Sequence, residues 1–119
     1  MRLAFAEVQS FVSDLASSRD FYEGTLGLEL KQETGDWLIF DVSGTTLILM
    51  SGAKQRPYEG RYGSMTGTVV CLLSEDIDRD HATLKQQGVR FFSSVNEVPE
   101  GRCVGFQDPD GNLLELIQK

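Results

Sequence analysis

The stretch FQDPDGNLLEL, residues 106–116, decides the fold of this chain. Its centre has the chemistry of a tight turn, because Pro109 fixes φ and Gly111 accepts a positive φ. The flanking residues are apolar or β-forming, as in paired strands. We therefore predict a hairpin with strands at 102–107 and 113–118.

Side chains on the last predicted strand alternate between two faces. Leu114 and Leu116 suit a face that packs against a helix. Leu113, Glu115 and Ile117 then lie on the opposite face. A strand with one apolar face and one mixed face indicates a sheet that is covered on one side and borders a cleft on the other.

The predicted elements occur twice in the same order. The first half has strands at 5–12, 28–33, 36–42 and 45–50, with a helix between Asp14 and Gly27. The second half has strands at 67–73, 89–92, 102–107 and 113–118, with a helix between Asp76 and Gly88. Because capping acids and terminal glycines recur at similar offsets, we interpret the chain as a diverged tandem duplication.

This duplication predicts an α+β fold of two tandem βαβββ modules. The modules are expected to form a curled, open, barrel-like mixed sheet with one main helix per module on the outside. We place module one at about 1–52, a connector at about 53–66, and module two at about 67–119. The chain of 119 residues fits one domain of ordinary size.

The charge and composition of the chain exclude several classes of binding partner. The formal net charge of −7 argues against nucleic acid and anionic membrane surfaces, which select basic proteins. The chain has no apolar run of about 18 residues and no signal-peptide pattern at its start. Cys71 and Cys103 fit neither a zinc motif nor a disulfide scaffold, so we expect buried, inert thiols and a cytoplasmic protein.

Three groups of residues together resemble the vicinal oxygen chelate superfamily (glyoxalase/bleomycin-resistance protein/dioxygenase). The first group is FVSDL (11–15) with FY (21–22) and LGL (26–28). The second is DID (76–78) with Leu84 and GV (88–89), and the third is the hairpin at 106–116. The resemblance covers nearly the whole chain. It implies one small-molecule pocket between the modules and a homodimer.

Metal-dependent members of this superfamily carry ligands at four cleft-facing positions. In this chain those positions correspond to Glu7, Ile48, Val69 and Glu115. Zinc, nickel and iron(II) sites need imidazole or thiolate ligands, and the single histidine, His81, is predicted to point outward from the second helix. We therefore expect no cofactor. If a metal binds, its ligands are Glu7 and Glu115, with Mg²⁺ or Mn²⁺ held weakly.

The residues leave three roles open for Glu7 and Glu115. Close together in a partly apolar cleft, they would raise at least one pKa and provide a general base. Ionised, they would bind a cationic or hydrogen-bond-donating ligand. In the third alternative, Glu7 is solvated and Glu115 is satisfied by a neighbour.

The predicted pocket wall is mainly apolar. Its ligand-binding candidates, beyond the two glutamates, are Phe5, Gln9, Phe40, Ile48, Met50, Val69, Cys71 and Leu113, with Leu73 beside them. In the connector, Tyr58 and Tyr62 either contact a ligand as part of a lid or belong to a simple link. Trp37 lies either in the pocket wall or in a dimer contact, and the sequence does not distinguish the two positions.

Three functions follow. The leading hypothesis is a binding protein for a small, cationic or amphiphilic molecule, without a transition metal. The alternative is a glyoxalase-like lyase or isomerase that uses Glu7 and Glu115 as acid and base or as ligands of a weakly held divalent metal. A third is a closed core with only a dimerisation or regulatory role. The sequence does not decide whether the protein is an enzyme.

Overall fold

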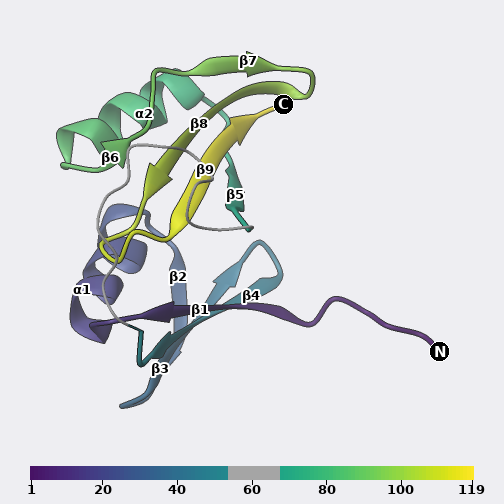
Figure 1. Cartoon of the computed structure of the whole chain (residues 1–119), viewed down its shortest axis with the longest axis vertical. Coiled ribbons are helices and arrows are strands. Elements are labelled where there is room, and N and C mark those ends of the chain that lie inside the picture. Colours follow the sequence, from purple (N-terminus) through teal and green to yellow (C-terminus); the bar gives the residue numbers. More distant parts are fainter. Residues whose placement is uncertain (54–67) are drawn as a thin grey trace. The chain divides into compact units, whose positions relative to one another are not determined.

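The computed structural model describes residues 1–53 and 68–119 of the chain. The chain divides into two compact units, Met1–Gln55 and Arg56–Lys119, and each unit is described by itself. Every described strand belongs to one of two mixed sheets, one sheet in each unit, and neither sheet closes into a barrel. This is an α+β fold whose elements follow the predicted order, with one added strand in the second unit (Figure 1).

The first unit is a βαβββ module. Its elements are β1 (Glu7–Val12), α1 (Leu15–Arg19), η1 (Asp20–Thr25), β2 (Glu29–Glu33), β3 (Trp37–Val42) and β4 (Thr45–Ser51). The strand order in the sheet is β1-β4-β3-β2. β1 runs parallel to β4, and the other neighbours are antiparallel. The module therefore begins and ends on adjacent strands.

The first helix starts as predicted but changes its form. The Asp14 side chain caps α1 by accepting a hydrogen bond from the backbone N–H of Ala16 at 2.9 Å. After Arg19 the backbone widens into the π-helix η1, and the N–H of Leu26 donates to the carbonyl oxygen of Phe21 at 2.8 Å. Gly27 follows with a φ of 72°, the conformation that ends helices.

The core of the first unit lies between this helical segment and one face of the sheet. Leu47 and Leu49, which share one face of β4, are 4% and 0% exposed. Phe40 pairs with Leu47 and shares its face, where its ring lies 6.0 Å from that of Tyr22. The prediction that Phe40 lines the cleft face is therefore wrong. The other face of this sheet is called the open face below.

The second unit repeats the module with one added strand. Its elements are β5 (Val70–Leu73), α2 (Ile77–Gln86), β6 (Arg90–Phe91), β7 (Asn96–Val98), β8 (Gly101–Gln107) and β9 (Leu113–Gln118). The sheet order is β5-β9-β8-β6, and β7 pairs with β8. β5 runs parallel to β9, as β1 does to β4. The sequence did not predict β7, which forms a hairpin with β8.

Helix α2 is fixed to its sheet by capping. Asp76 accepts from the N–H of Arg79 at 3.1 Å, and the side chain of Gln118 on β9 accepts from the N–H of Ile77 at 2.8 Å. Ile77 is fully buried. His81 is not the solvated helical residue that was predicted, because its ring packs edge-on against Phe91 with centroids 4.4 Å apart.

Hydrogen bonds to Asp108 hold the β8–β9 turn. Its carboxylate accepts from the N–H groups of Asp110 and Asn112 and from the Asn112 amide, at 2.8–2.9 Å. Gly111 has a φ of 85°, as a tight turn requires. Asp110 is only 2% exposed, and within the described part of the chain neither of its carboxylate oxygens has a hydrogen-bond partner.

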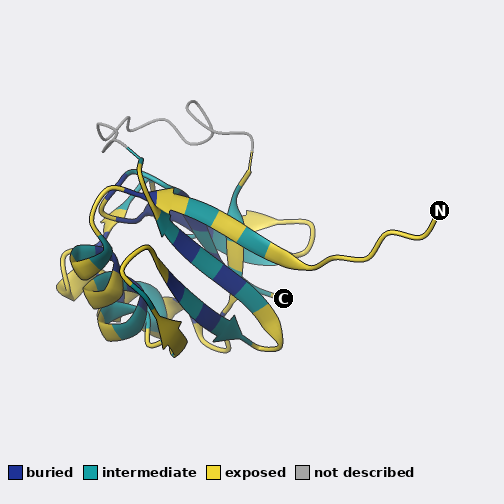
Figure 2. Ribbon diagram, turned by 90° about the horizontal axis from the view of Figure 1, so that it is seen from below, coloured by how far each residue is buried: buried dark blue, intermediate teal, exposed yellow. Residues whose placement is uncertain are grey.

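Burial follows the predicted strand alternation. Figure 2 shows buried bands along the strands and an exposed stretch of chain before β1. Leu114 and Leu116 are 1% and 6% exposed, whereas Glu115 and Ile117 between them are half-buried. Among the described residues, no helix is long and apolar enough to cross a membrane.

Candidate functional site

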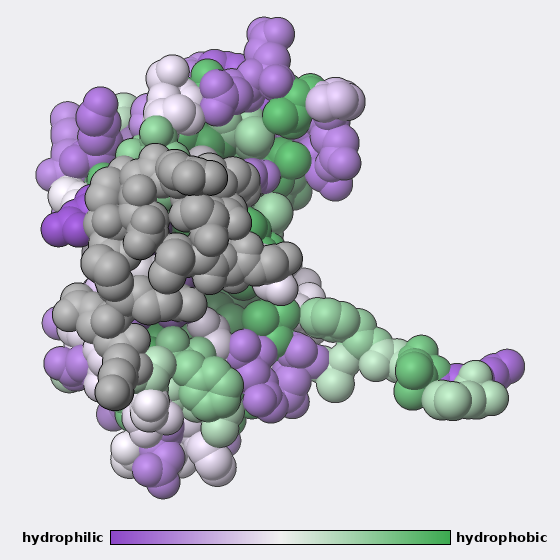
Figure 3. Space-filling model, viewed as in Figure 1, coloured by the Kyte–Doolittle hydropathy of each residue, from purple (hydrophilic) through white to green (hydrophobic). Residues whose placement is uncertain are grey.

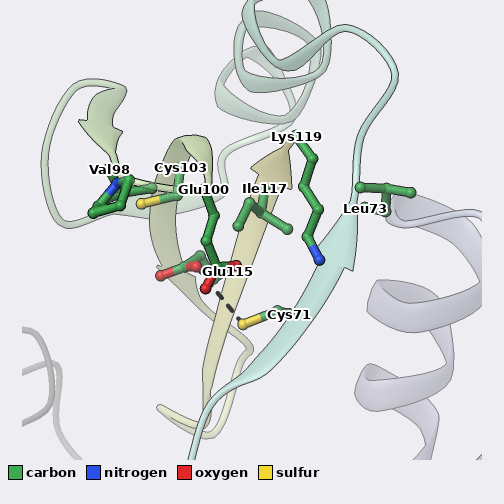
Figure 4. Close-up of a pocket in the computed structure, with 9 residues that line it drawn as sticks. Cys71, Leu73, Val98, Glu100, Cys103, Glu115, Ile117 and Lys119 are labelled. Atoms are coloured by element: carbon green, nitrogen blue, oxygen red, sulfur yellow. Dashed lines mark hydrogen bonds between the residues drawn. The ribbon is translucent and has the colours of Figure 1, made fainter.

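A cavity of about 570 Å³ lies on the face of the second sheet that bears Glu115 and Ile117 (Figure 4). Its wall comes from β5, β9, β8 and the β7–β8 turn. The lining residues are Cys71, Leu73, Val98, Pro99, Glu100, Cys103, Glu115, Ile117 and Lys119. Its volume is in the range of small-molecule sites in proteins.

Strand register places Glu115 at the centre of this pocket. Glu115 on β9 pairs with Cys71 on one side and with Gly105 on the other. The Cys71 thiol donates a hydrogen bond to Oε1 of Glu115, with an S–O distance of 3.7 Å (Figure 4). Gly105 has no side chain, so the β8 residue paired with Glu115 adds no polar group beside the carboxylate.

The two cysteines face the pocket and are not buried as predicted: Cys71 is exposed and Cys103 is half-buried. Partial burial raises the pKa of the Cys71 thiol, and the negative charge of Glu115 raises it further. Burial and the same carboxylate also raise the pKa of Cys103. Both thiols are thus protonated at neutral pH, where they are weak nucleophiles and Cys71 acts as a donor.

Charged groups of both signs border the pocket. Glu100 lies in the turn between β7 and β8, and Lys119 follows β9. Figure 4 shows Lys119, Glu115 and Cys71 extending over the same face of the sheet. Apolar side chains of Leu73, Val98, Pro99 and Ile117 form the rest of the wall. The arrangement suits a ligand with an apolar body and at least one hydrogen-bonding or charged group.

The first unit holds the other predicted site residues. Glu7, Gln9, Ile48 and Met50 lie on its open face, where the Gln9 amide donates to Oε2 of Glu7 at 2.8 Å. Phe5 is 74% exposed in the apolar stretch before β1 that Figure 3 shows. Glu7 and Glu115 belong to different units, so a shared role for them stays a prediction.

Two predicted wall residues of the second half do not line this pocket. Val69 precedes β5 and is half-buried, and Leu113 begins β9 and is only 7% exposed; neither lines the cavity. Tyr58 and Tyr62 lie outside the described residues. Of the residues predicted for the pocket wall, Cys71 and Leu73 line the pocket together with Glu115.

Sequence reasoning missed the contribution of the β7–β8 hairpin. Val98, Pro99 and Glu100 reach the pocket only because β7 pairs with β8. A signal was present, since Pro99 and Gly101 mark a turn between two short β-compatible runs. Cys103 could also have been found, because it pairs with Ile117 and shares its face.

Of the four superfamily ligand positions in this chain, Glu7 and Glu115 carry metal-binding side chains. Residues 1–53 and 68–119 contain no group of three or more histidine, cysteine, aspartate or glutamate side chains that could hold an ion. Two of the four superfamily ligand positions are the aliphatic residues Ile48 and Val69. His81 is on α2 beside Phe91. These four positions supply no imidazole or thiolate, the ligands that zinc, nickel or iron sites use.

Comparison with known proteins identifies the family. Residues 4–116 match the family model described as "Glyoxalase/Bleomycin resistance protein/Dioxygenase superfamily". A glyoxalase/bleomycin resistance protein from Streptomyces sp. CB03234 is 33% identical, with a TM-score of 0.73 over 97% of this chain and 100% of that chain. TnmS3, an antibiotic binding protein from the same organism, is 29% identical, with a TM-score of 0.74 over 99% and 98%.

A fosfomycin resistance protein from Listeria monocytogenes, solved with Mn(II), shares the fold. It is 22% identical, with a TM-score of 0.75 over 98% of this chain and 90% of that chain. The family-model match spans both units described above. The chain therefore belongs to the glyoxalase/bleomycin resistance protein/dioxygenase superfamily.

Proposed function

We propose that the protein binds a small amphiphilic molecule in the pocket of the second unit, without a transition metal. The observation that carries this proposal is the cavity of about 570 Å³ with a carboxylate, Glu115, at the centre of a largely apolar wall. A pocket of that size and composition encloses a drug-sized ligand and orients it by a few polar groups.

Glu115 is the group that we expect to set ligand orientation. An ionised carboxylate accepts hydrogen bonds from an amine, amide or hydroxyl of the ligand, and such charge-assisted bonds are the stronger kind. The Cys71 thiol approaches the same carboxylate from the β5 side.

One similar structure supports a binding role. TnmS3 is an antibiotic binding protein, and this chain covers almost all of it at 29% identity. The superfamily ligand positions of this chain offer two carboxylates and no imidazole, which suits a transition metal poorly. We therefore infer sequestration of an antibiotic-like molecule, with a cationic group favoured by the net charge of −7.

The test uses purified protein with and without EDTA, bleomycin and a panel of amphiphilic amines. We expect at least one compound to raise the melting temperature equally in both buffers, since a ligand stabilises the state that it binds. In calorimetric titration, Glu115→Gln should weaken that compound about 10- to 100-fold, the factor for loss of a charge-assisted hydrogen bond.

Glu97→Gln is the matched control, because Glu97 is exposed on β7 of the same sheet and does not line the pocket. It should bind like the wild type. Two outcomes would count against the proposal: equal weakening by both substitutions, or stabilisation that needs added Ni²⁺, Zn²⁺ or Mn²⁺. Turnover of a glutathione hemithioacetal that Glu115→Gln abolishes would favour the lyase instead.

A further inference from the structure

Charged residues of opposite sign lie at the two ends of one strand face in the pocket of the second unit. Alternate residues of a strand point to the same side, so Glu115 and Ile117 of β9 and Lys119 directly after it share the pocket face. Four residues of strand span about 13 Å, which sets the separation of the Glu115 and Lys119 backbones. The pocket floor is therefore negative at one end and positive at the other.

Strand register places an apolar row between these two charges. Ile117 pairs with Leu73 on β5 and with Cys103 on β8, and all three residues line the cavity. A ligand that reaches from Glu115 to Lys119 therefore crosses a surface of aliphatic and thiol side chains. Burial of an apolar segment against that surface is favourable.

The negative end of this face is influenced by two carboxylates. Glu115 lies in the floor, and Glu100 borders the pocket from the β7–β8 turn. Burial raises the pKa of the Cys71 thiol, and the negative charges of Glu115 and, to a smaller extent, Glu100 raise it too. Since both charges act on the same thiol, a cationic group placed beside Cys71 is attracted by both carboxylates.

The positive end consists of the Lys119 ammonium group, which has no partner within residues 1–53 and 68–119. It forms neither a hydrogen bond nor an ion pair there, although Glu100 and Glu115 line the same pocket. Figure 4 shows the Lys119 side chain extending over the pocket face. Because the lysine and the glutamates do not neutralise one another, charges of both signs stay available to a ligand.

We propose that the ligand of this pocket is a zwitterion with separated charges. Its cationic group binds at Glu115, its apolar segment crosses Ile117, and its anionic group binds at Lys119. This inference rests on the function proposed above and adds the anionic group to it. A simple amine leaves Lys119 without a partner, and a simple anion meets the negative charge of the glutamates, so neither is complementary to both ends.

Octylamine, 8-aminooctanoate and octanoate test the inference, because they share one eight-carbon chain and differ only in their charged ends. In calorimetric titration, 8-aminooctanoate should bind about fivefold more tightly than octylamine, the upper range for an ion pair with an exposed side chain such as Lys119. Octanoate should bind most weakly of the three. A rise in salt concentration should reduce the preference for the zwitterion, since ions screen exposed charges.

Lys119→Gln should abolish the preference, because it weakens 8-aminooctanoate about fivefold and does not weaken octylamine. Lys85→Gln is the matched control: it removes the same charge from an exposed position in the last turn of α2 that does not line the pocket. That variant should bind all three compounds like the wild type. Glu115→Gln should weaken both amines, since each places its ammonium group at Glu115.

Several results would overturn the inference. One is equal weakening of 8-aminooctanoate by Lys119→Gln and Lys85→Gln, which would mean that only the net charge matters. Another is binding of octylamine as tight as that of 8-aminooctanoate. If Glu115→Gln then weakens octylamine, the zwitterion is refuted and the proposed function stands. If none of the three compounds binds, the inference also fails, and the bleomycin and amine panel decides the proposed function separately.

Discussion

Gly101 begins β8 beside the turn that borders the pocket, and the structure permits no side chain there. A Cβ at this position would collide with the backbone carbonyl oxygen of Gln118 on the paired strand β9. The φ of Gly101 is 144°, which L-residues rarely adopt. We predict that Gly101→Ala strongly destabilises the second unit.

The expected magnitude has two parts. The positive φ alone costs about 1–3 kcal/mol. Relief of the collision requires the β8 and β9 backbones to separate, with loss of a few backbone hydrogen bonds at about 1 kcal/mol each. The total is about 3–5 kcal/mol, which should lower the melting temperature by roughly 12–20 °C for a chain of this size.

The variant Gly52→Ala separates the cost of the positive φ from the cost of the collision. Gly52 also has a positive φ, 121°, but a Cβ there would meet nothing within 4 Å. Its cost should be the backbone term alone, about 1–3 kcal/mol. Circular dichroism during urea and thermal unfolding measures both variants. Hydrogen exchange should show faster exchange in β8 and β9 of Gly101→Ala only. If Gly101→Ala costs no more than Gly52→Ala, the argument from the collision is wrong.

Three further predictions concern single side chains. Asp110→Asn should stabilise the protein by about 1–3 kcal/mol in urea unfolding, because it removes a buried carboxylate without a partner; destabilisation would reveal a cation bound to it. Alkylation of Cys71 by iodoacetamide should reach its half-maximal rate at a higher pH than for an ordinary thiol, and Glu115→Gln should shift that profile to lower pH. A Cys71 profile that Glu115→Gln leaves unmoved would contradict the assigned contact. Burial lowers the pKa of His81 in the folded protein. The neutral His81 side chain therefore contributes to the free energy of unfolding at pH values above the usual histidine pKa. This contribution is lost as the pH falls through the lowered pKa of the folded state. His81→Phe keeps a ring against Phe91 and should reduce the loss of stability between pH 7 and pH 5, measured as the difference in unfolding free energy.

Local chemistry explains which parts of the fold the sequence predicted. The β8–β9 hairpin follows from Pro109, Gly111 and the hydrogen-bonding side chain of Asp108, which act within a few residues. The caps Asp14 and Asp76 are equally local. Such features do not depend on the rest of the chain, so a single sequence reveals them.

The errors arose where the pattern was ambiguous. Leu38, Ile39 and Phe40 are three consecutive apolar residues, so alternation could not assign faces, and Phe40 was placed on the wrong one. The π-helix η1 was missed because its apolar spacing resembles that of an ordinary helix over so short a segment. Strand β7 has three exposed residues and no apolar face to detect.

The pocket was only partly predictable. Glu115 and Cys71 could be assigned to one face by alternation along strands that the sequence shows clearly. Glu100 enters the pocket through the hairpin of β7 and β8, whose pairs join residues only three to seven apart. It was missed because β7 is three residues long and exposed throughout, so no alternation of apolar residues marks it.

The pairing of the first and last strand within each module also determines the order of folding. Glu7 lies beside Thr46 in one sheet and Val70 beside Leu114 in the other, so each sheet is completed only when its final strand is available. Closing such long loops costs entropy and slows folding. During synthesis, β4 leaves the ribosome before β5, so the first module can fold while the second is still being made. Until its last strand emerges, the apolar helix-facing side of each nascent sheet stays exposed, and that interval is when the chain is most prone to aggregate.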